Sequence, residues 1–216
     1  WLPAPSEIDE SPTPEHSAEV AEQVSLAFLA VLERLGPEER AAFLLKEAFD
    51  YDYAQIAPLL GQSEANCRQM VHRARERVQA GRPRFDVAPE HHRHLLERFM
   101  RAAQRGDQPA ITALLSEDAR LVSDGGGKAG ALIRPLVGGG RLARLFWAVY
   151  RRHDPAIAWR MGTVNGEPAI LRYRDGVLAA VMVAVSDGER ISELFTVANP
   201  DKLGMAVTAK DGGASW

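Results

Sequence analysis

Nitrogen donors recur at helical spacing between residues 62 and 77, in the run QSEANCRQMVHRARER. Ser63 can begin a helix there, because its hydroxyl accepts hydrogen bonds from the free backbone N–H groups of the first turn. Small and apolar residues fall three or four positions apart and predict a narrow buried seam of Cys67, Val71, Ala74 and Val78. Another face presents guanidinium, amide and imidazole groups from Arg68, Gln69, His72, Arg73 and Arg75. Such donors suit guanine edges, adenine edges and phosphates. The run therefore indicates a helix that reads DNA, with an ordinary arginine-rich surface helix as the alternative.

Residues 37 to 61 predict two shorter helices that would hold this one in place. Pro37 and the two glutamates after it suit the first turn of a helix. Asp52 can cap a second helix, which would end at Gly61, a natural C-terminal cap. Pro58 lacks a backbone donor and predicts that this second helix is short or kinked. The apolar residues expected to face a core are Ala42, Phe43, Leu45, Phe49, Ile56, Leu59 and Leu60. Because only a short turn separates the last two helices, the pattern predicts a helix-turn-helix, whose second helix enters the major groove of DNA.

Charge is divided unevenly along the chain, whose formal net charge is −3. Residues 1–61 carry twelve acidic and three basic side chains, whereas residues 62–84 carry six arginines and two glutamates. A phosphate backbone would attract the second segment and repel the first. We therefore expect the DNA-facing surface to be local, and the acidic front half to face a different partner.

Composition limits the class of protein. Apolar content of 46% and charged content of 25% are typical of a soluble globular protein, and 216 residues suffice for two small domains. The single cysteine, Cys67, excludes an intrachain disulfide and fits a reducing compartment. The longest apolar run, residues 178–185, is too short to cross a bilayer, and no signal peptide is visible. We therefore expect a cytoplasmic protein without a membrane segment. Since the first residue is Trp1 and not methionine, we also expect the natural protein to begin further upstream.

Two proline-containing breaks divide the chain. Residues 1–14 hold four prolines without sustained periodicity, which predicts a linker. Residues 15–35 predict an amphipathic helix, which would complete a helical domain that ends at residue 80. A second linker is predicted at residues 81–88.

The pattern changes after residue 88. Helices are predicted at 89–104, 107–115 and 141–152, and strands at 119–124, 156–164, 168–174, 177–186 and 189–198. Three breaks between these strands are Asn-Gly or Asp-Gly pairs, which are strong hairpin signals, at residues 165–166, 175–176 and 187–188. We expect two or three helices packed on a curved antiparallel sheet, an α+β cone. The predicted fold class is thus multidomain, with an all-α helix-turn-helix bundle followed by this cone.

The run from Leu35 to Val78 resembles region 4 of the bacterial extracytoplasmic-function (ECF) sigma factors. The resemblance rests on LGPEER, on the aromatic Tyr53 before AQIAPLLG, and on SEANCRQMVHRARERV, in this order and spacing. It implies that the helix-turn-helix binds the −35 element of promoter DNA and docks on core RNA polymerase. It implies base and backbone contacts to DNA from Ser63, Arg68, Gln69, His72 and Arg73, and phosphate contacts from Arg75 and Arg77.

The second half resembles the NTF2-like fold of SnoaL-like polyketide cyclases, and three motifs resemble those of ECF sigma factors with such a fused domain. The motifs are Trp1-Leu-Pro-Ala-Pro5, Asp124-Gly-Gly-Gly-Lys128 and Asn199-Pro-Asp-Lys-Leu203, where Ala4 replaces the usual glutamate. The resemblance implies a σ2 domain before Trp1 and a cone, residues 89–204, that regulates the sigma factor from within. The tail would be residues 205–216. The implied contact residues are Trp1, Leu2, Pro3, Pro5, Asp124, Gly125, Gly126, Gly127, Lys128, Asn199, Pro200, Asp201, Lys202 and Leu203. We expect the cone to pack against the linker and the σ2 domain through the second and third motifs.

Two other functions remain open. A cone fused to a DNA-binding module could be an enzyme, which would need a carboxylate or histidine with a near-neutral pKa in an apolar cavity. The candidates are Asp124, His153, Asp154 and Glu193, but none forms a recognisable pair in the sequence, so we predict no catalytic residue. Alternatively, the cavity could hold a small ligand that the sequence does not name. His91 and His94 share a helix face without an evident acidic partner, so we predict no metal site and no cofactor.

Overall fold

The computed structural model describes residues 2–9, 29, 32, 35–81 and 88–204. The chain divides into two compact units. We call Phe28–Arg82 the helical unit, and we call the other unit, which combines Trp1–Ala27 with Pro83–Trp216, the cone unit. The first fourteen residues, predicted as a linker, are therefore grouped with the cone, and their described part lies against it.

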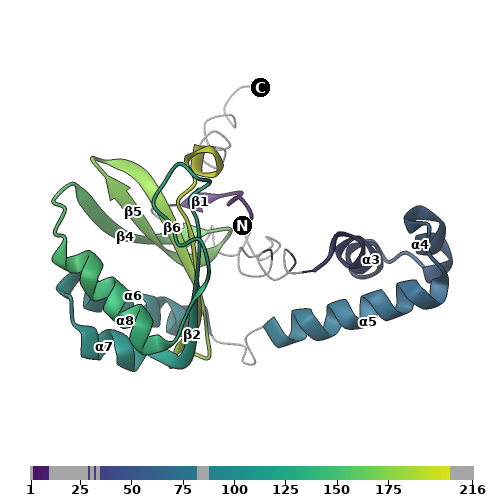
Figure 1. Ribbon diagram of the computed structural model, residues 1–216, viewed down its shortest axis with the longest axis horizontal. Helices are drawn as coiled ribbons and strands as arrows, with labels where there is room; N and C mark the ends of the chain where they lie inside the picture. Colours follow the sequence, from purple (N-terminus) through teal and green to yellow (C-terminus); the bar gives the residue numbers. More distant parts are fainter. Residues whose placement is uncertain (1, 10–28, 30–31, 33–34, 82–87, 205–216) are drawn as a thin grey trace. The chain divides into compact units, whose positions relative to one another are not determined.

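The helical unit is a helix-turn-helix preceded by a bracing helix (Figure 1). Its helices are α3 (Pro37–Glu47), α4 (Tyr53–Leu60) and α5 (Glu64–Gly81). The Asp52 backbone N–H donates to Gln55 Oε1 at 2.9 Å, which satisfies one free donor at the start of α4. Gly61 ends α4 in the left-handed conformation, with φ of 62°. Ser63 Oγ accepts from the Asn66 backbone N–H at 3.2 Å, as expected for an N-cap.

The core of the helical unit follows most of the predicted stripes. The seam of α5 is fully buried, since Cys67, Val71 and Ala74 are each 0% exposed, and it packs against apolar residues of α3 and α4. The prediction of a core position is wrong for two residues, since Phe49 is 66% exposed and Leu59 is 63% exposed. Helix α3 ends at Glu47, before the position where Phe49 would have continued its stripe.

The predicted helix at residues 15–35 lies almost wholly outside the described residues. Its two described inward positions, Leu32 and Leu35, are buried against Phe43, Ala74 and Val78. The other inward positions of this predicted helix lie outside the described residues.

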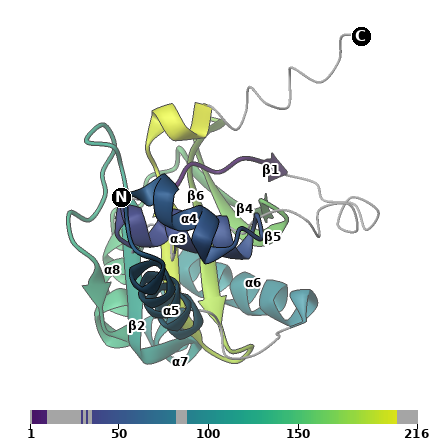
Figure 2. The same cartoon turned by 90° about the vertical axis from the view of Figure 1, so that its right-hand side faces the viewer.

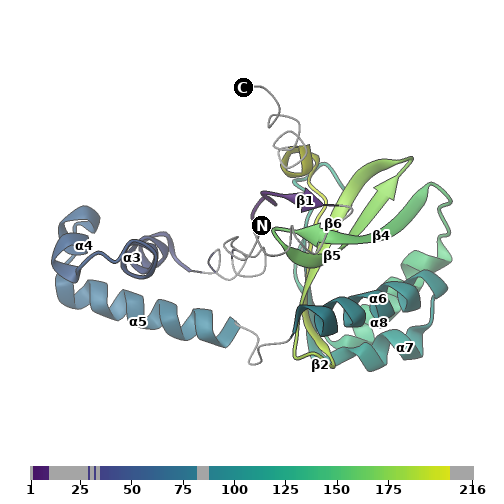
Figure 3. The same cartoon turned by 180° about the vertical axis from the view of Figure 1, so that it is seen from behind.

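The cone unit packs three helices on one face of a curved seven-stranded sheet. Figures 1 and 3 show this arrangement from the front and from behind. The helices are α6 (Pro89–Arg105), α7 (Gln108–Leu114) and α8 (Gly139–Arg151). The strands are β1 (Ile8–Asp9), β2 (Leu115–Asp124), β3 (Leu136–Val137), β4 (Ile157–Val164), β5 (Glu167–Arg174), β6 (Val177–Ser186) and β7 (Ile191–Val197). Their order across the sheet is β1-β4-β5-β6-β7-β2-β3.

Sheet turns fall where the sequence predicts them. Asn165 and Gly166 both have positive φ, as do Asp175 and Gly176, so each pair forms a tight hairpin turn. Between the sheet and the helices lies one apolar core, in which the Phe99 and Phe146 rings meet edge to face at 5.0 Å. The predicted fold class, a helix-turn-helix bundle followed by an α+β cone, is confirmed.

The sheet differs from the predicted antiparallel meander in two ways. Strand β2 pairs with β7 in parallel, because the chain crosses the sheet through β3 and α8 before the meander begins. Strand β1, from the segment predicted as a linker, pairs with β4 in the register Ile8↔Val164 (Figure 2). Both pairings join segments far apart in sequence, which local patterns do not reveal.

Candidate functional sites

The outward face of α5 is the candidate DNA-reading surface. Arg68, Gln69 and His72 are exposed, opposite the buried seam. Arg68 pairs with Glu64 one turn earlier at 2.9 Å, and its guanidinium lies over the Tyr53 ring at 5.2 Å. These contacts are solvent-exposed and hold Arg68 only weakly. The side chain is therefore available to exchange Glu64 for a base edge or a phosphate.

The flanking arginines of α5 have partners within the helical unit. Arg73 Nε donates to Glu39 Oε1 at 3.1 Å, and Arg77 pairs with the other oxygen of the same carboxylate. Arg75 Nη2 forms an ion pair with Glu47 Oε1 at 2.6 Å. With the second bond from Arg75 to Glu47, at 3.1 Å, four bonds run from α5 to α3, so these arginines brace the recognition helix against α3. The sequence shows the six arginines but not these acidic partners, which lie 28 to 38 residues away in the chain.

Glu39 is the centre of this brace. Burial acts to raise the pKa of Glu39, but the hydrogen bonds from Arg73 and the Gly36 backbone and the charge of Arg77 outweigh it, so the pKa lies below its ordinary value. The carboxylate therefore stays ionised and keeps both guanidinium groups paired.

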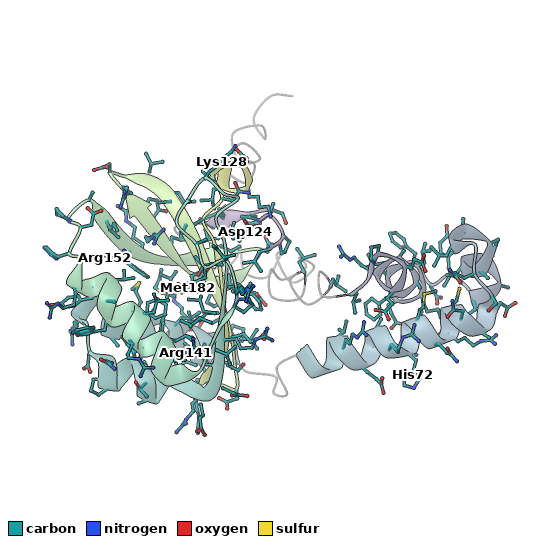
Figure 4. All side chains as sticks on the ribbon, viewed as in Figure 1. His72, Asp124, Lys128, Arg141, Arg152 and Met182 are labelled. Carbon is teal, nitrogen blue, oxygen red and sulfur yellow. The ribbon has the colours of Figure 1, made fainter. Side chains whose placement is uncertain are left out.

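Asp124 is the centre of a second site, where the three sequence motifs meet. Its carboxylate is buried and accepts from Lys202 Nζ at 2.6 Å, from the Leu2 backbone N–H at 3.1 Å and from the Gly126 backbone N–H at 2.9 Å. Lys202 also donates to the backbone oxygen of Leu2. Figure 4 shows Asp124 beside the helical turn at residues 200–204. The Asp124–Lys202 ion pair and its hydrogen bonds to the Leu2 backbone thus join residues 2, 124 and 202. We call Leu2, Asp124, Gly126, Asn199 and Lys202 the latch.

The N-terminal segment continues from the latch along the sheet. Leu2 and Pro5 are buried, and Leu203 is buried on the third motif. The Ser6 and Glu7 backbone N–H groups donate to Asn165 Oδ1 at 2.9 and 3.1 Å. The pair Asn165–Gly166 was predicted only as a turn, and its role as an anchor for this segment was missed. Residues 2–9 are therefore a docked strap on the cone and not a free linker.

Two features of the structure require glycine at position 126. Its φ is +59°, and a Cβ atom there would lie 2.4 Å from the side-chain amide of Asn199, which is itself buried. Asn199 Oδ1 accepts from the Asp201 backbone N–H at 3.1 Å, which starts the helical turn. The glycine run thus lets the second and third motifs approach closely.

Lys128 and Asp201 form an outer pair above the latch. Their closest atoms are 2.7 Å apart, but the side chains are 59% and 64% exposed. The Asp124–Lys202 pair has the same chemistry with exposures of only 6% and 12%. Trp1 lies outside the described residues.

Acid should weaken the latch. Burial acts to raise the pKa of Asp124, but the hydrogen bonds from Lys202, Leu2 and Gly126 and the Lys202 charge outweigh it, so its pKa lies below the ordinary value of 3.8. A carboxylate whose pKa is lowered by folding contributes stability above its unfolded pKa, and this is lost as pH falls through the folded value. We expect thermal unfolding to separate the protein from its Asp124→Asn variant at about pH 6, and this gap to narrow progressively as the pH falls below 3.8. A gap that persisted unchanged in acid would contradict this assignment.

The candidate catalytic residues are not gathered in one place. The cone holds a cavity of about 1550 Å³ that His153 and Asp154 line, whereas Asp124 and Glu193 do not. Asp154 pairs with Arg174 at 2.7 Å, and Glu193 lies 3.6 Å from Arg120. His153 is exposed. None of the four is a buried, unpaired acid or base inside the cavity.

Within the described part of the chain, no three or more His, Cys, Asp or Glu side chains are grouped closely enough to hold a metal ion. No helix among the described residues is both long and apolar enough to span a membrane.

Comparison with known proteins identifies the family. Residues 25–78 match the family described as Sigma-70, region 4. The ECF RNA polymerase sigma factor SigJ of Mycobacterium tuberculosis is 33% identical over 215 residues, which cover 94% of this chain and 69% of SigJ. The probable ECF RNA polymerase sigma factor SigI of the same species is 32% identical over 184 residues, which cover 84% of this chain and 60% of SigI. The crystal structure of SigJ superposes with a TM-score of 0.72 at 30% identity, covering 95% of this chain and 75% of that one. The chain belongs to the ECF RNA polymerase sigma factors.

Proposed function

We propose that the helical unit binds the −35 element of promoter DNA through the outward face of α5. The observation that carries this proposal is the exposed trio Arg68, Gln69 and His72 on a helix whose opposite face is fully buried. Ser63 lies at the start of the same helix and is exposed, within reach of a phosphate. We propose fewer DNA-contacting residues than the sequence predicts. Arg73, Arg75 and Arg77 are left out because they form ion pairs with Glu39 and Glu47.

Core RNA polymerase is the second proposed partner. Membership of the sigma-factor family supports it, and so do two large apolar side chains that the helical unit leaves outside its core, Phe49 and Leu59. Exposed apolar side chains mark a contact surface where they gather into one patch. We propose that they face the polymerase while α5 faces DNA.

The latch is the proposed regulatory element. It joins the segment before region 4 to the domain after it, since the Leu2 backbone is hydrogen-bonded to both partners of the Asp124–Lys202 ion pair. Region 4 lies between these attachment points in the chain, so a closed latch ties both of its ends to the cone. We propose that the closed latch limits access of region 4 to promoter DNA, and that opening the latch releases it. A σ2 domain before Trp1, which the family resemblance implies, would be restrained by the same strap.

Salt should weaken DNA binding steeply if α5 contacts phosphates. Each phosphate that a protein neutralises releases counterions, so log K falls by about 0.9 per contact for each unit of log salt concentration. The DNA would be a duplex that this protein selects from a randomised pool. For it, we expect a plot of log K against log salt concentration to have a slope of about −2 or steeper. Fluorescence anisotropy at increasing sodium chloride concentrations measures this slope. A flat response would remove the proposed DNA-reading role of α5.

A further inference from the structure

The cone cavity has an apolar wall. Among its lining residues are Leu121, Phe146, Trp159 and Met182, and Figure 4 shows Met182 between the sheet and α8. Strands and α8 line it, together with the loop that follows the second motif, and it is open to solvent on one side. A volume of about 1550 Å³ exceeds what one small organic molecule needs. The cavity can therefore hold a ligand with an apolar body.

Charge in the cavity is mainly positive. Its cationic lining residues are Lys128, Arg152, Arg172 and Arg174, whereas Asp154 is the one acid among the lining residues. Asp154 is already paired with Arg174, and Lys128 with Asp201. The cavity therefore favours an anionic guest over a neutral or cationic one.

Among the described cations that line the cavity, Arg172 is the partly buried one for which the protein supplies no partner. It lies on β5 opposite Trp159 of β4, on the same sheet face as the core residue Ile170. Within the described part of the chain, its guanidinium makes no hydrogen bond and no ion pair, although the side chain is partly buried. Burial, and then the charge of Arg174, lower the pKa of Arg172. A partly desolvated guanidinium without an acceptor is unfavourable, and five N–H donors facing a cavity suit a planar anion.

Thr196 adds a second polar atom on the same wall. Its hydroxyl is buried in the cavity lining and has no hydrogen-bond partner within the described residues. Thr196 pairs with Met182 across the sheet, and Met182 neighbours Ile170 of the Arg172 strand. One unpartnered guanidinium against an apolar wall matches a singly charged carboxylate better than a phosphate, which needs more donors. The Thr196 hydroxyl lies two strands away on β7 and can bond another polar group of the guest.

We propose that the cone cavity binds a small organic carboxylate, with Arg172 pairing to the carboxylate and the apolar wall holding the rest of the molecule. The inference is independent of DNA reading and of the latch. The cavity adjoins the latch nevertheless, because its lining residues Ser123 and Ala198 are the chain neighbours of Asp124 and Asn199. An occupant would therefore touch the strands that carry the latch.

Calorimetric titration tests this with three carboxylates and their neutral amides: 2-naphthoate, phenylacetate and octanoate. We expect at least one carboxylate to bind the intact chain at least about tenfold more tightly than its amide, as a charged hydrogen bond implies. Arg172→Gln should remove this preference and leave the affinity for the amide within about twofold. Arg144→Gln removes the same charge from an exposed position of α8 that does not line the cavity, and it should change neither affinity. The corresponding phosphate, 2-naphthyl phosphate, should bind more weakly than 2-naphthoate.

Thermal unfolding supplies an independent readout that does not depend on the choice of ligand. Because Arg172 has no protein partner, Arg172→Gln should leave the unfolding temperature unchanged or raise it. The proposal is overturned if no carboxylate binds at millimolar concentration, if amides bind as tightly, if phosphate is preferred, or if Arg172→Gln strongly destabilises the cone.

Discussion

Lys202→Met releases residues 2–9 from the cone while the cone itself stays folded. Among the described residues, Lys202 is the cation that pairs with the Asp124 carboxylate, and the two side chains are only 12% and 6% exposed. Removing one partner of a buried ion pair leaves an uncompensated charge and costs about 3–5 kcal/mol. The Leu2, Ser6 and Glu7 N–H groups, which are now bonded to Asp124 and Asn165, should then exchange with solvent about a hundredfold faster or more. Hydrogen–deuterium exchange read by mass spectrometry measures this directly.

Lys128→Met is the matched control for that experiment. It removes the same charge from the same site, but the Lys128–Asp201 pair is more than half exposed on both sides. Exposed pairs contribute about 1 kcal/mol or less, so exchange in residues 2–9 should rise by less than about fivefold. Protection of the β5 and β6 amides should be unchanged in both variants, which shows that the cone is intact. Equal exchange of residues 2–9 in the two variants would mean that the buried pair does not hold the strap.

Arg68→Ala weakens binding of the −35 element more than any other single arginine change in α5. Arg68 is the arginine of this helix held only by a one-turn pair and a stacked ring, so it is the one free to turn to DNA. Loss of a base-reading arginine costs about 1–3 kcal/mol and relaxes preference at the base that it reads. Fluorescence anisotropy with the selected duplex and its single-base variants measures both effects.

Arg75→Ala is the control for this second prediction. It removes the same charge from the same helix, but its guanidinium is already bonded to Glu47 by two nitrogens. We expect a smaller loss of affinity, spread evenly over all duplexes, with a small loss of thermal stability. If Arg75→Ala relaxed base preference and Arg68→Ala did not, the two residues would have been assigned the wrong roles.

Local patterns predicted the elements that local physics determines. Ser63, Asp52 and Gly61 act as caps through contacts with residues next to them, so the helix-turn-helix could be read from the sequence. The hairpins at Asn165 and Asp175 follow from residues that tolerate positive φ. In each of these cases the deciding contacts span only a few residues.

Long-range pairings were not predictable in the same way. The parallel contact of β2 with β7 and the addition of β1 to the sheet depend on where distant segments meet. Motif resemblance indicated that residues 124–128 and 199–203 contact the linker, but it did not separate the two lysines. Only the exposed fractions of the side chains distinguish them: Lys202 pairs with the buried Asp124, whereas Lys128 pairs with the exposed Asp201. Similarly, nothing local to Arg73, Arg75 or Arg77 reveals that their acceptors are on α3.

Affinity for the selected −35 duplex, compared between the intact chain and its Lys202→Met variant, tests the central claim most directly. If the closed latch limits region 4, opening it should strengthen DNA binding by the coupling energy of the two sites, about 1–3 kcal/mol or roughly 5- to 150-fold. Lys128→Met should bind like the intact chain, because it leaves the buried pair in place. Tighter binding by Lys202→Met alone is the predicted result. Equal affinity of all three proteins, with the strap shown by exchange to be released, would contradict the regulatory role of the latch.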